Sequence, residues 1–225
     1  MKFLEKEGYL EYLNEGELIL CVKDALEKSL RKLDHKAVDW LIMYYGNKLK
    51  THFGREEYLN ILLNKNEAEI IIELGKIIGK DIIIEEYRID RLHISGLSEE
   101  YRDTKRNPFT EYSIEVEDKF VVRLNLSDCG LNSFPKIITE LIKLETLILN
   151  GNELKEISKS ILDMKYLRFV SIARCGIQNI PNWFKNLKLL KGIYLLEGIN
   201  LSGNPLNERS KELIKNFKNI EYWVN

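Results

Sequence analysis

The sequence predicts an α/β solenoid, in which a short strand and a turn repeat along the chain after a set of N-terminal α-helices. Four stretches start over on one template, and the first three begin 23 residues apart: VVRLNLSDCGL (121–131), LETLILNGNEL (144–154), LRFVSIARCGI (167–177) and LEGINLSGNPL (196–206). Each has an apolar residue at its first, fourth, sixth and eleventh places and Asn or Cys at its ninth. A fixed period of this length indicates a repeat architecture.

The template has a physical explanation. Leu124 and Leu126 are two residues apart, so they point to the same face of a short strand. No single unit buries that face alone, and stacked units cover one another. At the ninth place the chain leaves the strand, where Asn can bond main-chain groups and Cys is small enough to be buried. The ninth-place residues are Cys129, Asn152, Cys175 and Asn204.

The template LxxLxLxxN/CxL, followed by P-x-x-[IF]-x-x-L, resembles the leucine-rich repeats of Ras-binding scaffold proteins and bacterial effectors. The preceding segment, EAEIIIELGKIIGKDI and then FTEYSIEVEDKFVVRLNLSDCGL, is similar to the lead-in of archaeal leucine-rich repeat proteins. The resemblance implies a leucine-rich repeat solenoid of four to five repeats. It also implies recognition of a protein partner through the concave face of the sheet.

The chain divides by pattern into three parts. Residues 1–64 have helical periodicity at 19–33, 38–53 and 56–63, which predicts a small α-helical domain. Residues 65–120 predict a helix at 67–78 that ends at Gly79, and then a β-hairpin that caps the solenoid. Residues 121–225 predict the solenoid itself, closed by a helix at 207–217 and a short strand near 220–223. We place the last repeat at 196–206 and interpret 190–195 as an insertion.

Composition favours a cytoplasmic protein. The net charge is −1 and there is no basic cluster of the kind that binds nucleic acid. The N-terminal segment lacks the pattern of a signal peptide, and no apolar run reaches the ~20 residues that span a bilayer. We expect the three cysteines, Cys21, Cys129 and Cys175, to be reduced and buried, which indicates a reducing compartment.

The sequence offers little chemistry. The three histidines, His35, His52 and His93, have no spacing typical of a metal site. The segment 75–80, GKIIGK, is too short for a phosphate-binding loop and coincides with a helix end. We therefore predict no catalytic residue, cofactor or metal, and a non-catalytic adaptor as the function. The alternatives are a regulator of a small GTPase and an enzyme with its activity in residues 1–64.

The candidate binding site lies on the strands, where alternate side chains point away from the predicted core. Ile148 and Phe169 are apolar exceptions on that otherwise polar face, and arginines flank them, which is typical of an interface anchor. The alternative is that the loop 95–110 or the helical domain folds over both residues. The predicted protein-binding residues are Arg123, Asn125, Ile148, Phe169, Ser171 and Arg174.

Overall fold

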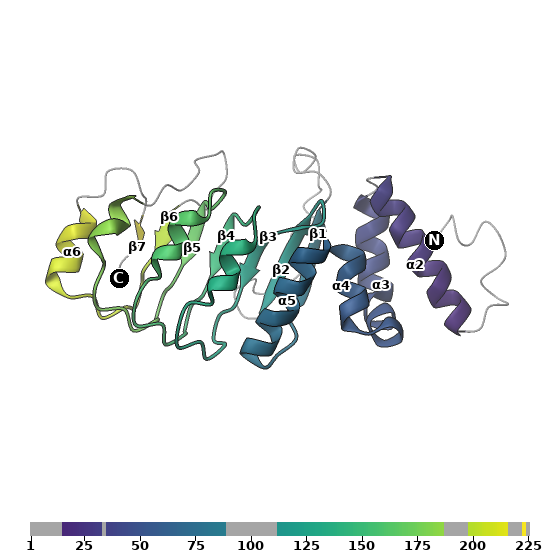
Figure 1. Cartoon of the computed structure of the whole chain (residues 1–225), viewed down its shortest axis with the longest axis horizontal. Helices are drawn as coiled ribbons and strands as arrows, with labels where there is room; N and C mark the ends of the chain where they lie inside the picture. The colour runs from purple at the N-terminus through teal and green to yellow at the C-terminus, as the bar shows by residue number, and fades with distance from the viewer. Residues whose placement is uncertain (1–14, 33–34, 89–111, 187–197, 216–221, 224–225) are drawn as a thin grey trace.

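The computed structural model describes residues 15–32, 35–88, 112–186, 198–215 and 222–223, and the molecule is elongated (Figure 1). Within these residues one sheet of seven strands has the order β1-β2-β3-β4-β5-β6-β7. Neighbouring strands are parallel, except that β2 and β3 are antiparallel. Helices α2, α3 and α4 lie at one end of the molecule and α6 lies at the other (Figure 1). The protein is a mixed α/β fold with one open, mostly parallel sheet.

Four helices precede the sheet in the chain, and they lie where the apolar periodicity predicted helices. They are α2 (Glu15–Arg31), α3 (His35–Phe53), α4 (Arg55–Leu62) and α5 (Lys65–Ile78). Helix α2 buries Ile19, Val22 and Leu26, whose spacing places them on one face. Asn64 caps the start of helix α5, because its side chain accepts the amide hydrogen of Glu67, and Gly79 caps its end with φ 66°. The prediction that Gly79 ends this helix is confirmed.

The strands are β1 (Ile83–Arg88), β2 (Ser113–Glu117), β3 (Phe120–Asn125), β4 (Thr146–Ile148), β5 (Phe169–Ser171), β6 (Gly198–Asn200) and β7 (Tyr222–Trp223). From β3 onward the pairing register joins Leu124, Leu147, Val170 and Ile199, which are all buried. The register at β6 confirms that the last template match begins at residue 196. The predicted insertion at 190–195 lies outside the described residues.

Short 3-10 helices connect the later strands and form a layer on one face of the sheet. They are η3 (Lys136–Glu140), η4 (Lys159–Asp163) and η5 (Asn182–Asn186). Each buries one large apolar side chain against the strands, namely Ile138, Ile161 and Phe184. Helix α5 packs beside η3, so it extends the same layer towards the N-terminus. The helix α6 (Glu208–Lys215) follows β6 and buries Ile214.

The fold class predicted from the sequence is wrong. The sequence predicted a leucine-rich repeat solenoid with a capping hairpin and a small all-α domain. The sheet overturns this description, because β1 pairs parallel to β2 and makes the β2–β3 hairpin an interior part of the sheet. One continuous buried cluster also runs from Ile19 in α2 to Ile214 in α6. The division at residues 64 and 120 stays a prediction.

The asparagines at the ninth template place hold successive strands together. The side-chain amide of Asn152 donates to the carbonyl oxygens of Leu126 and Leu149, each at 2.8 Å. Its Oδ1 accepts the amide hydrogens of Cys129 at 3.1 Å and Leu131 at 2.9 Å. Asn204 makes the corresponding four bonds two templates further on. Buried main-chain groups that leave the strands are thus satisfied by a side chain.

Candidate functional site

Most of the residues predicted to bind a protein are buried. Ile148 has 0% of its surface exposed and Phe169 has 5%, so neither is an exposed anchor. Asn125 and Ser171 are also buried, with 0% and 2% exposed. A mostly parallel sheet is commonly covered on both faces, whereas the prediction assumed one solvated face. Of the six residues, Arg174 is exposed and Arg123 is half-buried.

Arg123 is engaged by a neighbouring strand. Its Nη1 lies 2.9 Å from Oε1 of Glu115, and both side chains are at least four-fifths buried. A second pair of the same kind joins Arg168 and Glu145, whose Nε and Oε2 are 3.0 Å apart. Removing one partner of such a pair leaves a buried charge behind, which is strongly destabilising. These arginines therefore belong to the internal structure of the sheet.

The polar residues of the same strands bond to one another. Oδ1 of Asn125 accepts from the hydroxyl of Ser127 at 2.7 Å and from its amide at 3.1 Å. Oδ1 of Asn150 accepts from the hydroxyl of Ser171 at 2.6 Å and from the amide of Ala173 at 2.9 Å. Hydrogen bonds of this type satisfy polar groups at the strand ends. Asn125 and Ser171 thus have structural partners.

An exposed rim begins where the strands end. Asp128, Gly151, Arg174 and Gly203 occupy the same template place and all have positive φ, between 52° and 69°. The carboxylate of Asp128 lies over Gly151, because a Cβ at Gly151 would be 1.9 Å from Oδ1 of Asp128. The side chain of Arg174 lies in the same way beside Gly203. The rim thus alternates a charged side chain with a glycine that makes space for it.

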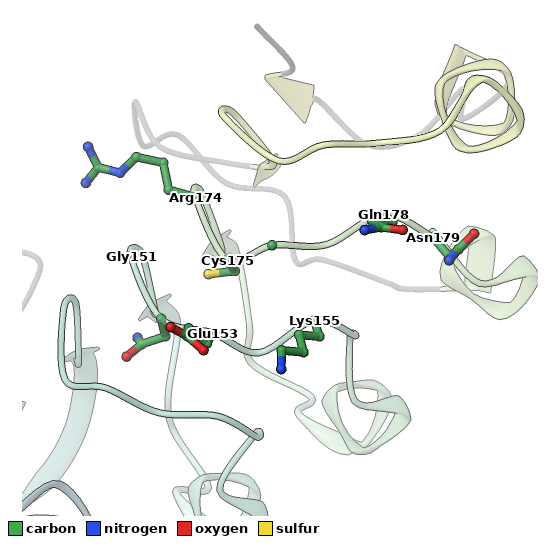
Figure 2. Close-up of a pocket in the computed structure, with 9 residues that line it drawn as sticks. Gly151, Glu153, Lys155, Arg174, Cys175, Gln178 and Asn179 are labelled. Carbon is green, nitrogen blue, oxygen red and sulfur yellow. The ribbon is translucent and has the colours of Figure 1, made fainter.

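A pocket of about 530 Å³ lies next to this rim, between the loops that follow β4 and β5. Figure 2 shows Glu153 and Lys155 on one loop and Arg174, Gln178 and Asn179 on the next, with Arg174 extending away from the two amides. The lining residues are Gly151, Asn152, Glu153, Lys155, Arg174, Cys175, Gly176, Gln178 and Asn179. The lining includes two cations, one carboxylate and three side-chain amides, so its charged groups have an excess of positive charge. The excess of positive charge suits an acidic group of a ligand.

The cysteine in the pocket is buried, and its thiol contacts main chain. Sγ of Cys175 lies 3.1 Å from the carbonyl oxygen of Leu149. Burial raises the pKa of this thiol above its ordinary value, and burial raises the pKa of the Cys129 thiol as well. A raised pKa disfavours the nucleophilic thiolate, so both thiols are structural. Cys21 is exposed and Cys129 is half-buried, which corrects the prediction that all three cysteines are buried.

Sequence reasoning missed the pocket residues Glu153, Lys155, Gln178 and Asn179. No sequence motif singles these residues out, because the loops after β4 and β5 come together only when the two strands pair. The signal that could have found the pocket is the template itself, in which 153 and 176 occupy the same place in consecutive units. His93 lies outside the described residues, and so does the loop 95–110 that was an alternative cover for Ile148 and Phe169. Within the described part of the chain, no group of three His, Cys, Asp or Glu side chains is arranged to hold a metal ion, and no helix could span a bilayer.

The chain is similar to an adenylate cyclase. Over 136 residues it is 29% identical to the adenylate cyclase of Schizosaccharomyces pombe, and the match covers 58% of this chain. It covers 8% of the cyclase, so the chain spans a small part of that enzyme's length. No family model matches the chain.

This similarity corrects the function predicted from the sequence. We predicted a non-catalytic adaptor that binds a protein on a concave face, and we predicted that the chain is not an enzyme. The matched protein is an enzyme by name, which points away from both predictions. The predictions relied on the repeat resemblance and on the absence of catalytic motifs, but catalytic side chains are often far apart in sequence and meet only in the folded chain.

Proposed function

We propose that this chain is a component of an adenylate cyclase-type enzyme. The observation that carries the proposal is the 136-residue match to the cyclase of Schizosaccharomyces pombe. The match covers 8% of that enzyme, so the chain corresponds to a small part of it, and we propose the role of a component and not of a whole cyclase. A cytoplasmic, reducing compartment, as expected from the cysteines, is part of the same proposal.

Within this role, the pocket beside Arg174 is the place where we expect a ligand group to bind. Lys155 and Arg174 are two exposed cations that line the pocket, with the Arg174 side chain extending away from Gln178 and Asn179, and Glu153 supplies one carboxylate. Guanidinium and ammonium groups both bind carboxylates and phosphates, and the guanidinium does so with two parallel hydrogen bonds. The pocket therefore favours an anionic group, whether it belongs to a small molecule or to another polypeptide.

The decisive experiment measures cyclic AMP formation from ATP. The purified chain is assayed alone and after addition to a separately purified cyclase catalytic region. Product from the chain alone would place the catalytic centre within it, and a change in the rate of the added catalytic region would make it a regulatory component. If neither mixture differs from its blank, the proposal is wrong.

Variants of the pocket refine the same assay. Lys155→Glu and Arg174→Glu should each reduce the effect of the chain severalfold, because they reverse the charge offered to an anion. Lys136→Glu is the matched control, since Lys136 is an exposed lysine on η3 and does not line the pocket. The protein partner predicted from the sequence, including a small GTPase, is a further proposal, and adding the GTP-loaded GTPase to the assay tests it.

A further inference from the structure

Helix α5 is joined to the β2–β3 hairpin by a set of hydrogen bonds at its first turn. The main-chain amide and the side-chain amide of Asn64 both donate to the carbonyl oxygen of Lys119, each at 3.0 Å. Two places after the start of the helix, Glu67 directs its carboxyl group at the same hairpin. Its Oε2 accepts the amide hydrogen of Val121, the second residue of β3. The helix and the hairpin thus meet through three bonds around one turn.

That turn has an uncommon backbone. Asp118 and Lys119 are its central residues, and their φ angles are 49° and 66°. A two-residue hairpin turn needs positive φ at both places, which glycine and asparagine adopt most easily. Lys119 in particular has a side chain that disfavours this conformation. The bonds from Asn64 to the Lys119 carbonyl oxygen therefore stabilise a turn that its own residues do not favour.

Glu67 is the unusual member of this junction, because it is a carboxylic acid with only 2% of its surface exposed. Burial raises its pKa to about 7, although the amides of Val121 and Ile142 and the charge of Lys143 all favour the ionised form. Glu117, which precedes the turn on β2, is half-buried, and the other charged side chains near the junction, on α5, on the turn and on η3, are exposed: Lys65, Glu69, Asp118, Lys119, Lys136 and Glu140. Lys65 and Glu69 also form an ion pair with each other at 3.9 Å.

We propose that the junction between α5 and the β2–β3 hairpin is a proton-operated latch, which the protonated side chain of Glu67 holds closed. Protonated Glu67 can lie in the buried junction and still accept from Val121 through its carbonyl oxygen. Ionisation places a charge in a buried site, where the amides of Val121 and Ile142 and the ammonium group of Lys143 compensate only part of the desolvation. Opening the junction to water therefore becomes easier. Once open, the turn at Asp118 and Lys119 loses the bonds that hold it.

The sign of the pH dependence follows from the two states. The closed junction binds the proton of Glu67 up to about pH 7, whereas an open, hydrated Glu67 releases it near its ordinary pKa of 4.5. Opening therefore releases a proton, and the opening equilibrium constant rises about tenfold per pH unit between roughly pH 5 and pH 7. Above pH 7 both states are ionised and the constant levels off.

The test is hydrogen exchange of the Val121 amide in the full chain, corrected for the pH dependence of intrinsic exchange. Between pH 5.5 and pH 8 its protection factor should fall about tenfold per unit up to pH 7 and then level off. Glu67→Gln keeps an acceptor for Val121 and should remove this slope. Glu69→Gln is the matched control on the exposed side of the same helix and should keep it.

A flat protection factor in the unaltered chain, or an unchanged slope in Glu67→Gln, would overturn the proposal. Where Glu67→Gln does not fold, the carboxyl carbon resonance of Glu67 in the unaltered chain decides the matter. A titration midpoint near 7 supports the latch, and a midpoint near 4.5 overturns it. These outcomes do not depend on cyclic AMP formation, so the latch and the proposed function fail independently.

Discussion

The side chain of Asn152 accepts a hydrogen bond from the main-chain amide of Cys129, which occupies the same place one template earlier. Its Oδ1 accepts the amide hydrogen of Cys129 at 3.1 Å, while its side-chain amide donates to Leu126 and Leu149. Asn204 stands in the same relation to Cys175, whose amide lies 2.9 Å from Oδ1 of Asn204. Each asparagine of the ninth place thus also accepts the main-chain amide of the cysteine one template earlier.

Replacing Asn152 by Ala should destabilise the protein by about 2–4 kcal/mol, because two amides and two carbonyl oxygens lose a buried partner. The measurement is the free energy of unfolding in urea. Asn132→Ala is the control, since Asn132 is an exposed asparagine in the loop after β3. Equal effects of the two substitutions would show that the bonds of Asn152 contribute little.

Substitutions of Cys175 test the role of cysteine at the ninth template place. Cys175→Asn should change the free energy of unfolding by less than about 1 kcal/mol, because an asparagine amide can replace the contact of Sγ with Leu149. Cys175→Leu should cost about 1–3 kcal/mol, because it adds volume to a fully buried turn. Thermal unfolding of both variants checks this, and comparable losses in the two would mean that Asn does not fit this turn.

Phe169→Ala should lower the free energy of unfolding by about 3–5 kcal/mol, since the ring has 5% of its surface exposed. This is the opposite of what an exposed binding anchor would do. Arg174→Ala, on the exposed rim of the same strand end, is the control and should change it by less than about 0.5 kcal/mol. If Phe169→Ala leaves stability unchanged, the ring is accessible in solution after all.

Gly151→Ala should cost more than Gly176→Ala. Both glycines have positive φ, 68° and 70°, so both substitutions carry the left-handed backbone penalty of about 1–2 kcal/mol. A Cβ at Gly151 also meets Oδ1 of Asp128 at 1.9 Å, whereas a Cβ at Gly176 meets nothing within 4 Å. In an Asp128→Gly background the difference should shrink, and chemical denaturation of the four variants measures it. A difference that persists there would rule out Asp128 as its cause.

The sequence predicted local structure well where one element carries its own signal. Apolar spacing located helices α2 to α5, Gly79 marked the end of α5, and the template placed the strands from β3 to β6 in register. It predicted the binding face poorly. The alternation along a strand shows that Ile148 and Phe169 share one face, but it does not show whether that face is covered.

By itself the sequence determined where helices α2 to α5 and strands β3 to β6 lie, and why Asn or Cys follows each short strand. These properties depend on neighbours within a few residues or on one exact repeat, and both can be read along the chain. Only the tertiary structure decided that β1 extends the sheet, that the hairpin is interior, and that Glu67 is buried against Val121, 54 residues away. The burial of a side chain and the pKa of a carboxyl group depend on what packs against them, and that is settled when distant segments meet.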